Sequence, residues 1–173
     1  IHQSTSEPWR VTLLDTGAET GTGGRLKVAR DHLEGEEAFC FTYGDAVANV
    51  DVTKLVGFHR EHGKLATMTT IQPPSRYGVL AFDGDRITDF QEKPPGEGGW
   101  INGGFFVLSP KVIDYIDTLE THWEYGPLQR LIEEDQLSAF FHRGFWQCMD
   151  TLRDKNVLED HWSSAAPPWK LWD

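Results

Sequence analysis

The chain has 173 residues, 39% of them apolar, so it is long enough to bury a core and too apolar to remain disordered. Its formal net charge of -11 disfavours a nucleic-acid partner, because a phosphate backbone would be repelled, although a small phosphorylated substrate can still bind through a metal ion or a few local cations. No segment approaches the roughly 20 consecutive apolar residues that cross a bilayer, which predicts no membrane partner. The two cysteines, Cys40 and Cys148, are predicted to be reduced core thiols of a cytoplasmic protein.

The first half of the chain is predicted to form a strand–helix–strand unit. Residues 37–42 are a short apolar run that is typical of a buried strand. A helix follows, with Asp51 as its N-cap, apolar side chains at the spacing of one helix face, and Gly63 at its end. Residues 65–71 are rich in β-forming side chains and predict the next strand. Because strands joined by a helix usually run parallel, the sheet is expected to be at least partly parallel.

The second half is predicted to contain a hairpin and then further strands and helices. The hairpin spans residues 78–90 and turns at an Asp-Gly pair. The further strands are residues 103–108, 137–142 and 145–149, and the further helices start near Pro110, Pro127 and Thr151. These elements predict one domain, residues 1–173, of the mixed α/β class: a mainly parallel sheet flanked by helices, with a small antiparallel insertion. The apolar tail at 167–172 is expected to pack on the core or on a partner subunit.

Two aspartates follow predicted strands and are candidates for binding a metal ion at the edge of one sheet. Asp45 lies where the first strand ends, and Gly44 before it lets a ligand approach the backbone. Asp150 follows the strand at 145–149, where a helix begins. Carboxylates in such places suit Mg²⁺, which takes its other ligands from phosphate and water. The alternatives are an ordinary turn aspartate at position 45 and an N-cap for the following helix at position 150.

Two further segments could contact an anionic substrate. Pro94 holds Lys93 in an extended conformation, from which its ammonium group could reach a phosphate, and Glu92 could accept hydrogen bonds from sugar hydroxyls. The glycine-rich stretch at 22–25 lies at the start of a helix and could hold an anion or the edge of a base. The alternatives are a solvated Glu–Lys pair and an ordinary flexible loop.

Taken together and in this order, these segments resemble the sugar-1-phosphate nucleotidyltransferases, and the resemblance covers nearly the whole chain. The segment at 145–155, Phe-Trp-Gln-Cys-Met-Asp-Thr-Leu-Arg-Asp-Lys, is the most discriminating, because Leu152 stands where relatives that use other nucleotides tend to have glycine. It is similar to the glucose-1-phosphate cytidylyltransferases. The other segments that carry the resemblance are 14–17, 22–26, 42–45, 76–78, 90–94 and 101–106.

The resemblance implies a Rossmann-like nucleotidyltransferase fold and a reaction of CTP with glucose 1-phosphate that gives CDP-glucose and pyrophosphate. It also implies that Asp45 and Asp150 hold Mg²⁺ and that Lys93 holds the sugar phosphate, so that these three form the catalytic set. The residues expected to line the substrates are Thr20, Arg25 and Gly44 along the nucleotide, and Gly78, Glu92 and Asn102 around the sugar.

The sequence also departs from the family it resembles. Members open with a strand and a glycine-rich loop that grips the triphosphate, and nothing before Leu14 is similar to it. We therefore expect a chain that lacks this N-terminal segment, and two hypotheses stay open. The first is a cytidylyltransferase whose missing segment lies upstream or in a companion fragment; the second is an inactive remnant that binds sugar phosphate or nucleotide, or serves as an assembly subunit. In either case the aromatic tail predicts a homo-oligomer.

Overall fold

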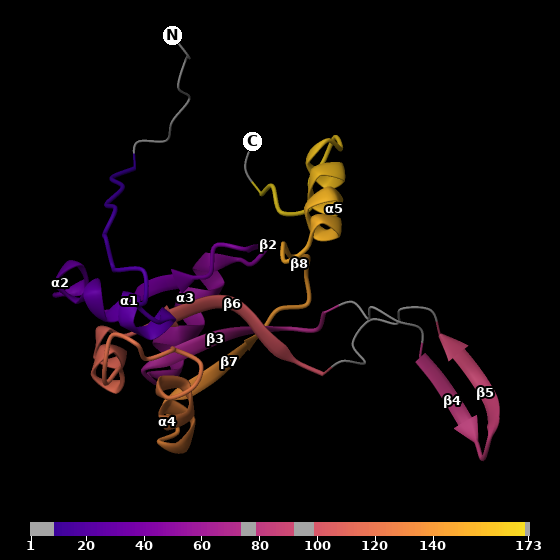
Figure 1. Ribbon diagram of the computed structural model, residues 1–173, viewed down its shortest axis with the longest axis horizontal. Helices are drawn as coiled ribbons and strands as arrows, with labels where there is room; N and C mark the ends of the chain where they lie inside the picture. Colours follow the sequence, from indigo (N-terminus) through magenta and orange to yellow (C-terminus); the bar gives the residue numbers. More distant parts are fainter. Residues whose placement is uncertain (1–8, 74–78, 92–98, 172–173) are drawn as a thin grey trace, which may run out of the picture.

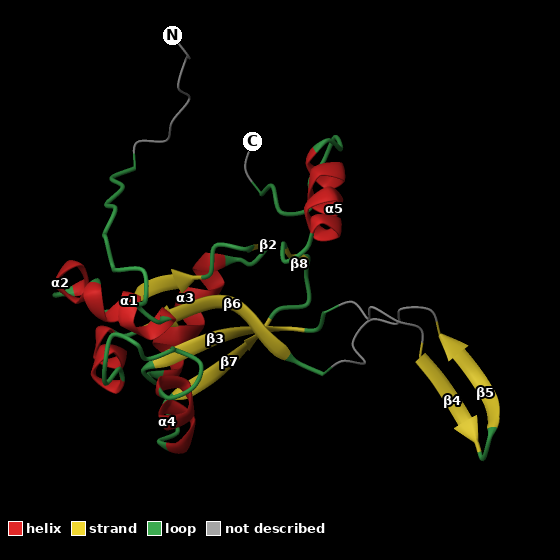
Figure 2. Ribbon diagram, viewed as in Figure 1, coloured by secondary structure: helices red, strands yellow, loops and turns green. Residues whose placement is uncertain are grey.

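A computed structural model of the chain describes residues 9–73, 79–91 and 99–171. Its centre is a four-stranded sheet with strands in the order β1-β6-β3-β7 (Figure 1). The bounds of these strands are Phe39–Thr42 for β1, Ala66–Ile71 for β3, Ile101–Leu108 for β6 and Leu137–Phe141 for β7. The expected mixed α/β fold is confirmed, since helices accompany the strands along the whole described chain (Figure 2).

The direction of the strands follows the prediction more closely than their pairing does. β6 is antiparallel to both β1 and β3, and β3 is parallel to β7. Consequently β1, β3 and β7 point the same way and β6 alone is reversed, but because β6 lies between β1 and β3 only the β3–β7 pairing is parallel, and the sheet is mixed instead of mainly parallel. The predicted strand–helix–strand unit exists, but β6 lies between its two strands.

A short antiparallel ribbon lies beside this sheet. Its strands are β2, Ala46–Ala48, and β8, Trp146–Cys148. Asp45 and Asp150 therefore lie at the edge of one sheet, but it is this two-stranded sheet and not the central one, because β8 pairs only with β2 among the described strands.

Local signals fix the helix ends. Asp51 caps α3, Val52–His62, by accepting a hydrogen bond from the Lys54 N–H at 3.0 Å, and Gly63 ends the helix with a φ of 67°. The helix predicted at Pro110 is instead the 3₁₀ helix η1, Pro110–Tyr115, which Ser109 caps. The remaining helices are α1 at Thr22–Val28, α2 at Arg30–Leu33, α4 at Pro127–Glu133 and α5 at Leu152–Trp162.

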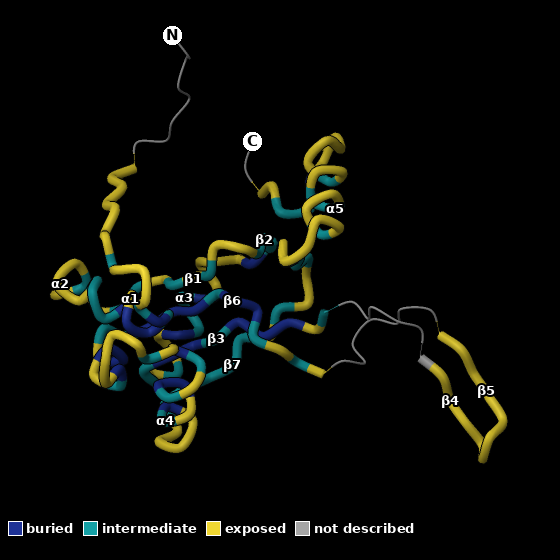
Figure 3. The backbone as a smooth tube through the Cα atoms, in the orientation of Figure 1, coloured by how far each residue is buried: buried dark blue, intermediate teal, exposed yellow. Residues whose placement is uncertain are grey.

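The core lies where β1, β3 and β6 pack against η1 and α4 (Figure 3). Trp123 and Phe106 are its largest members, exposed by 0% and 1%. The prediction that both cysteines are core thiols is wrong. Cys40 is exposed and Cys148 only half-buried, because side chains alternate between the two faces of a strand and Cys40 falls on the outer face of β1.

Two peripheral features were also predicted, the hairpin and the tail. The hairpin consists of β4, Val79–Asp83, and β5, Arg86–Gln91, joined through Gly84 with a φ of 62°. In the tail, Trp169 packs against Phe145 at 5.5 Å between ring centroids and against His161 of α5, so within the described residues this segment contacts the β8–α5 region and not the core clusters. No helix in the described ranges has the length and hydropathy needed to cross a membrane.

Candidate functional site

The structure brings the two candidate aspartates to the same end of the β2–β8 ribbon. Asp45 directly precedes β2 and Asp150 follows β8 by two residues. The Met149 N–H donates to the Asp45 carbonyl oxygen at 2.7 Å, so the backbones that carry both carboxylates are joined. Both residues are exposed. The ribbon thus brings together two aspartates that are 105 positions apart in sequence.

The alternative of an N-cap at position 150 is wrong, because Thr151 caps α5. The Thr151 hydroxyl accepts from the Asp154 N–H at 3.2 Å, and the Asp154 carboxylate accepts from the Thr151 N–H at 3.0 Å. The side chain of Asp150 takes no part in this capping box. Its carboxylate is exposed and accepts a hydrogen bond from the Cys148 thiol.

Three ligand atoms gather near Asp150, but they are not equivalent. One ligand atom each from Cys148, Asp150 and Asp154 lies within 4.8 Å of the other two. Burial, and then a hydrogen bond to Asp150, raise the pKa of the Cys148 thiol, and sulfur is a softer ligand than the oxygen donors that Mg²⁺ prefers. Asp154 is held in the capping box. Asp150 is thus the member of the group best suited to a hard cation.

The glycine-rich segment is neither a flexible loop nor an open cradle for an anion. Thr22 begins α1, and Gly23 and Gly24 are buried against the 119–123 segment. A Cβ atom on Gly24 would lie 1.8 Å from the Leu119 carbonyl oxygen. These glycines are required because two backbone segments pack in direct contact.

Two residues predicted to lie along the nucleotide are Thr20, just before this helix, and Arg25, within it. Thr20 donates its hydroxyl hydrogen to the Thr16 carbonyl. The exposed Arg25 guanidinium donates to the Thr16 hydroxyl and, at 3.4 Å, to the Ala18 carbonyl. Gly44 has no atom within 4 Å of the place a Cβ would occupy, so the backbone there is open to a ligand.

Asn102, predicted in the sugar pocket, lies half-buried on β6 with its carboxamide held in place. Its Oδ1 accepts from the Gly104 N–H at 2.8 Å, and its Nδ2 donates to the Tyr43 hydroxyl at 3.4 Å. The other predicted sugar-site residues, Gly78, Glu92 and Lys93, lie outside the described residues.

Sequence reasoning missed Glu124, which is half-buried beside these residues. Its carboxylate accepts from the Tyr43 hydroxyl at 2.5 Å and from the Thr22 hydroxyl at 2.8 Å. Its partners are 81 and 102 positions away in sequence, so no local pattern signals its role.

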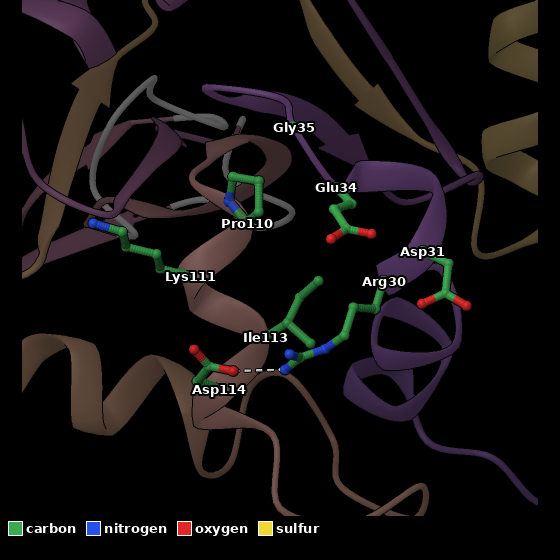
Figure 4. A pocket seen from close by; sticks show the side chains of 8 residues that line it. All are labelled: Arg30, Asp31, Glu34, Gly35, Pro110, Lys111, Ile113 and Asp114. Atoms are coloured by element: carbon green, nitrogen blue, oxygen red, sulfur yellow. Dashed lines mark hydrogen bonds and ion pairs between the residues drawn. The ribbon is translucent and has the colours of Figure 1, made fainter.

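A separate surface cavity of about 380 Å³ lies between α2 and η1 (Figure 4). Its charged lining is Arg30, Lys111, Asp31, Glu34 and Asp114, and Arg30 pairs with Asp114 at 2.6 Å. It contains none of the residues predicted to bind substrate. With more carboxylates than cations, it is poorly suited to a phosphate.

Two strand-end aspartates on a mixed α/β fold are compatible with an enzyme that handles phosphorylated substrates. The chain belongs to the nucleotidyl transferase family, whose pattern it matches over residues 2–154. This confirms the resemblance found in the sequence.

Individual relatives agree. Over 173 residues the chain is 51% identical to the glucose-1-phosphate cytidylyltransferase of Salmonella typhi, covering 100% of this chain and 67% of the relative. It is 39% identical over 167 residues to the probable glucose-1-phosphate cytidylyltransferase of Bacillus subtilis, covering 96% of this chain and 65% of the relative. The crystal structure of HddC from Yersinia pseudotuberculosis shares the fold, with a TM-score of 0.59 and 22% identity over 83% of this chain and 63% of that chain. The chain therefore spans about two thirds of the length of these relatives.

Proposed function

We propose that the chain contributes to nucleotidyl transfer from CTP to glucose 1-phosphate, which gives CDP-glucose and pyrophosphate. The observation that carries this proposal is the 51% identity to a glucose-1-phosphate cytidylyltransferase over all 173 residues. The proximity of Asp45 and Asp150 supports it, because phosphoryl chemistry on a triphosphate needs positive charge beside the phosphates, and in an acidic chain a bound cation is the natural source.

The donors at this site fit Mg²⁺. The ion prefers oxygen ligands, usually one or two carboxylates, and keeps water and substrate phosphates as the rest of its shell. Asp45 and Asp150 would supply two exposed carboxylates, whereas the soft sulfur of Cys148 would not compete for a hard cation. When bound, Mg²⁺ would neutralise phosphate charge.

The protein's own residues would act by positioning the substrates. Asn102 would present its carboxamide to a sugar hydroxyl, and the open backbone at Gly44 would border the nucleotide. The guanidinium of Arg25 is held by Thr16 and Ala18 in the preceding loop, so this side chain would lose little conformational entropy on binding an anionic ligand. Lys93 and Glu92 would complete the sugar-phosphate site. The sugar phosphate is itself the nucleophile, so no covalent intermediate with the protein is needed.

The proposal is tested by measuring pyrophosphate release from glucose 1-phosphate with CTP, UTP or dTTP, in the presence and absence of Mg²⁺. We expect turnover that is fastest with CTP and needs the metal. Asp45→Asn and Asp150→Asn should each lower kcat by about 100-fold or more, because each removes a charge that holds the ion. Asp31→Asn, an exposed aspartate on α2, is the matched control and should leave the rate unchanged.

Folded protein that turns over none of the three nucleotides would overturn the proposal for this chain. If such protein still bound glucose 1-phosphate or CTP in a calorimeter, the result would support the alternative of a binding remnant. Equal losses in Asp31→Asn and Asp150→Asn would overturn the assignment of the metal site alone.

A further inference from the structure

Glu124 joins three segments of the proposed site through one carboxylate. One oxygen accepts from the hydroxyl of Tyr43, which leads directly into the Gly44-Asp45 turn. The other accepts from the hydroxyl of Thr22, the first residue of α1. The Tyr43 oxygen in turn accepts from Asn102 at 3.4 Å. The network thus connects the metal, nucleotide and sugar sides of the site.

The direction of each hydrogen bond in this network is fixed. Burial would raise the pKa of Glu124, but hydrogen bonds from Tyr43 and Thr22 outweigh it and hold that pKa below its ordinary value, so the carboxylate is charged and only accepts. Burial, followed by the bond to Glu124, raises the pKa of Tyr43, so the phenol keeps its proton and donates it. The Tyr43 oxygen is consequently left to accept from Asn102.

The carboxamide of Asn102 is oriented as a result. Its oxygen is occupied by the Gly104 N–H and one Nδ2 hydrogen by Tyr43. The described residues provide no acceptor for the second Nδ2 hydrogen, which leaves it for a ligand oxygen. Gly104 also makes room for this arrangement, since a Cβ there would lie 3.0 Å from the Tyr43 ring.

The segment that carries Glu124 is held in place by burial and by backbone hydrogen bonds. The neighbouring Trp123 is fully buried, and its backbone N–H donates to the Thr22 hydroxyl at 2.8 Å. The Gly24 N–H donates to the Thr121 carbonyl at 3.1 Å, and the Gly21 N–H to the Leu119 carbonyl at 2.9 Å. A carboxylate fixed in this way can hold its partners in one geometry, as the supporting partners of metal and substrate ligands do in enzymes.

We propose that Glu124 is a positioning residue for nucleotidyl transfer, which sets the Tyr43–Asp45 turn and the Asn102 carboxamide in the geometry that binds the sugar phosphate and the metal. This inference rests on the proposed function. It assigns to Glu124 no contact with the substrates; the residue acts through Tyr43, Thr22 and Asn102.

The chain offers a matched control for this proposal. The Tyr115 hydroxyl donates to Glu134 at 2.5 Å, the same length as the Tyr43–Glu124 bond, but this pair joins η1 to α4 and contacts none of the proposed site residues. Glu134→Gln should therefore reproduce the loss of a Tyr–Glu hydrogen bond without disturbing the site. Because the Tyr43–Glu124 pair is half-buried and the Tyr115–Glu134 pair is exposed, the informative difference is a shift in KM or in the Mg²⁺ requirement that occurs only in Glu124→Gln.

The experiment compares the KM for glucose 1-phosphate, the Mg²⁺ concentration for half-maximal rate, and kcat in Glu124→Gln, Glu134→Gln and the parent chain. Glu124→Gln should lower kcat/KM by about 10–100-fold, with a raised KM and a raised Mg²⁺ requirement. A merely structural role would lower only the fraction of folded protein, and hence the apparent kcat, and leave both concentrations unchanged. Tyr43→Phe, which removes one hydroxyl and keeps the Glu124–Thr22 bond, should raise the same KM and serves as the readout if Glu124→Gln does not fold.

The outcomes separate this inference from the proposed function. An active parent in which Glu124→Gln and Tyr43→Phe keep the parental KM and Mg²⁺ requirement overturns the inference alone, as would equal shifts in Glu134→Gln. A folded parent with no activity overturns the proposed function and, with it, the role given to Glu124.

Discussion

Replacing Thr67 with valine would break a hydrogen-bonded chain that joins α3 to β3 and is buried away from the proposed site. The Thr67 side chain is 0% exposed, and its hydroxyl lies 2.6 Å from His62 Nε2 and 2.9 Å from His59 Nδ1. The Lys64 N–H donates to His62 Nδ1 at 2.9 Å. His62 therefore carries its proton on Nε2 and donates it to Thr67, whose hydroxyl hydrogen then goes to His59.

The expected loss of stability follows from the two hydrogen bonds of the Thr67 hydroxyl. Valine has nearly the same shape as threonine but can make neither bond, and a buried hydrogen bond contributes about 0.5–1.5 kcal/mol. Thr67→Val should thus lower the free energy of unfolding by about 1–3 kcal/mol. For a chain of this size each kcal/mol corresponds to about 2–4 °C, so the thermal midpoint should fall by roughly 2–12 °C.

Thr69, two residues along the same strand, supplies the control. It is also 0% exposed, but its hydroxyl has no hydrogen-bond partner within the described part of the chain. Thr69→Val removes an unsatisfied buried hydroxyl and should be neutral or stabilising. The stabilities of the two variants are compared by thermal and urea unfolding, monitored by far-UV circular dichroism. The reasoning fails if Thr67→Val is no less stable than Thr69→Val.

Two further predictions concern pH and backbone packing. Burial lowers the pKa of both His59 and His62, and the nearby charges of His62 and Lys64, respectively, lower these pKa values further. The unfolded chain therefore binds more protons than the folded chain at acidic pH. The free energy of unfolding should consequently fall as the pH decreases below about 6.5. Urea midpoints that stay constant from pH 7.5 to pH 5 would contradict this. Gly24→Ala should destabilise the fold by at least about 2 kcal/mol, since its Cβ would lie 1.8 Å from a backbone oxygen, whereas Gly57→Ala in α3, with no atom within 4 Å, should stabilise it by about 0.5–1 kcal/mol. Equal thermal midpoints for the two alanine variants would refute that argument.

Features encoded by neighbouring residues were predictable from the sequence. Asp51 and Gly63 mark the two ends of α3 because capping depends on residues within one turn. The Asp-Gly turn of the hairpin is equally local. The family could also be predicted, because the segments around Asp45 and Asp150 resemble known motifs regardless of the residues that they contact in the fold.

Features that depend on distant contacts were not predictable. The helix expected at Pro110 is a 3₁₀ helix, which buries Val112 and Ile113 in the core. Cys40 lies in an apolar run, yet the strand directs it outward. Glu124 belongs to a segment without a motif, and its importance arises only when Tyr43 comes within hydrogen-bonding distance of it.

The insertion of β6 between β1 and β3 has a consequence for how the chain folds. Phe39 pairs with Leu108, and Ala66 pairs with both Leu108 and Leu137, so each strand of the central sheet finds its partners only after long stretches of intervening chain. Contacts so remote in sequence slow folding, because the entropy of closing a long loop is lost before the contacts form. During synthesis β1 and β3 would leave the ribosome with unpaired edges until β6 follows. A pause in translation before residue 101 would therefore hold the chain in its most aggregation-prone state.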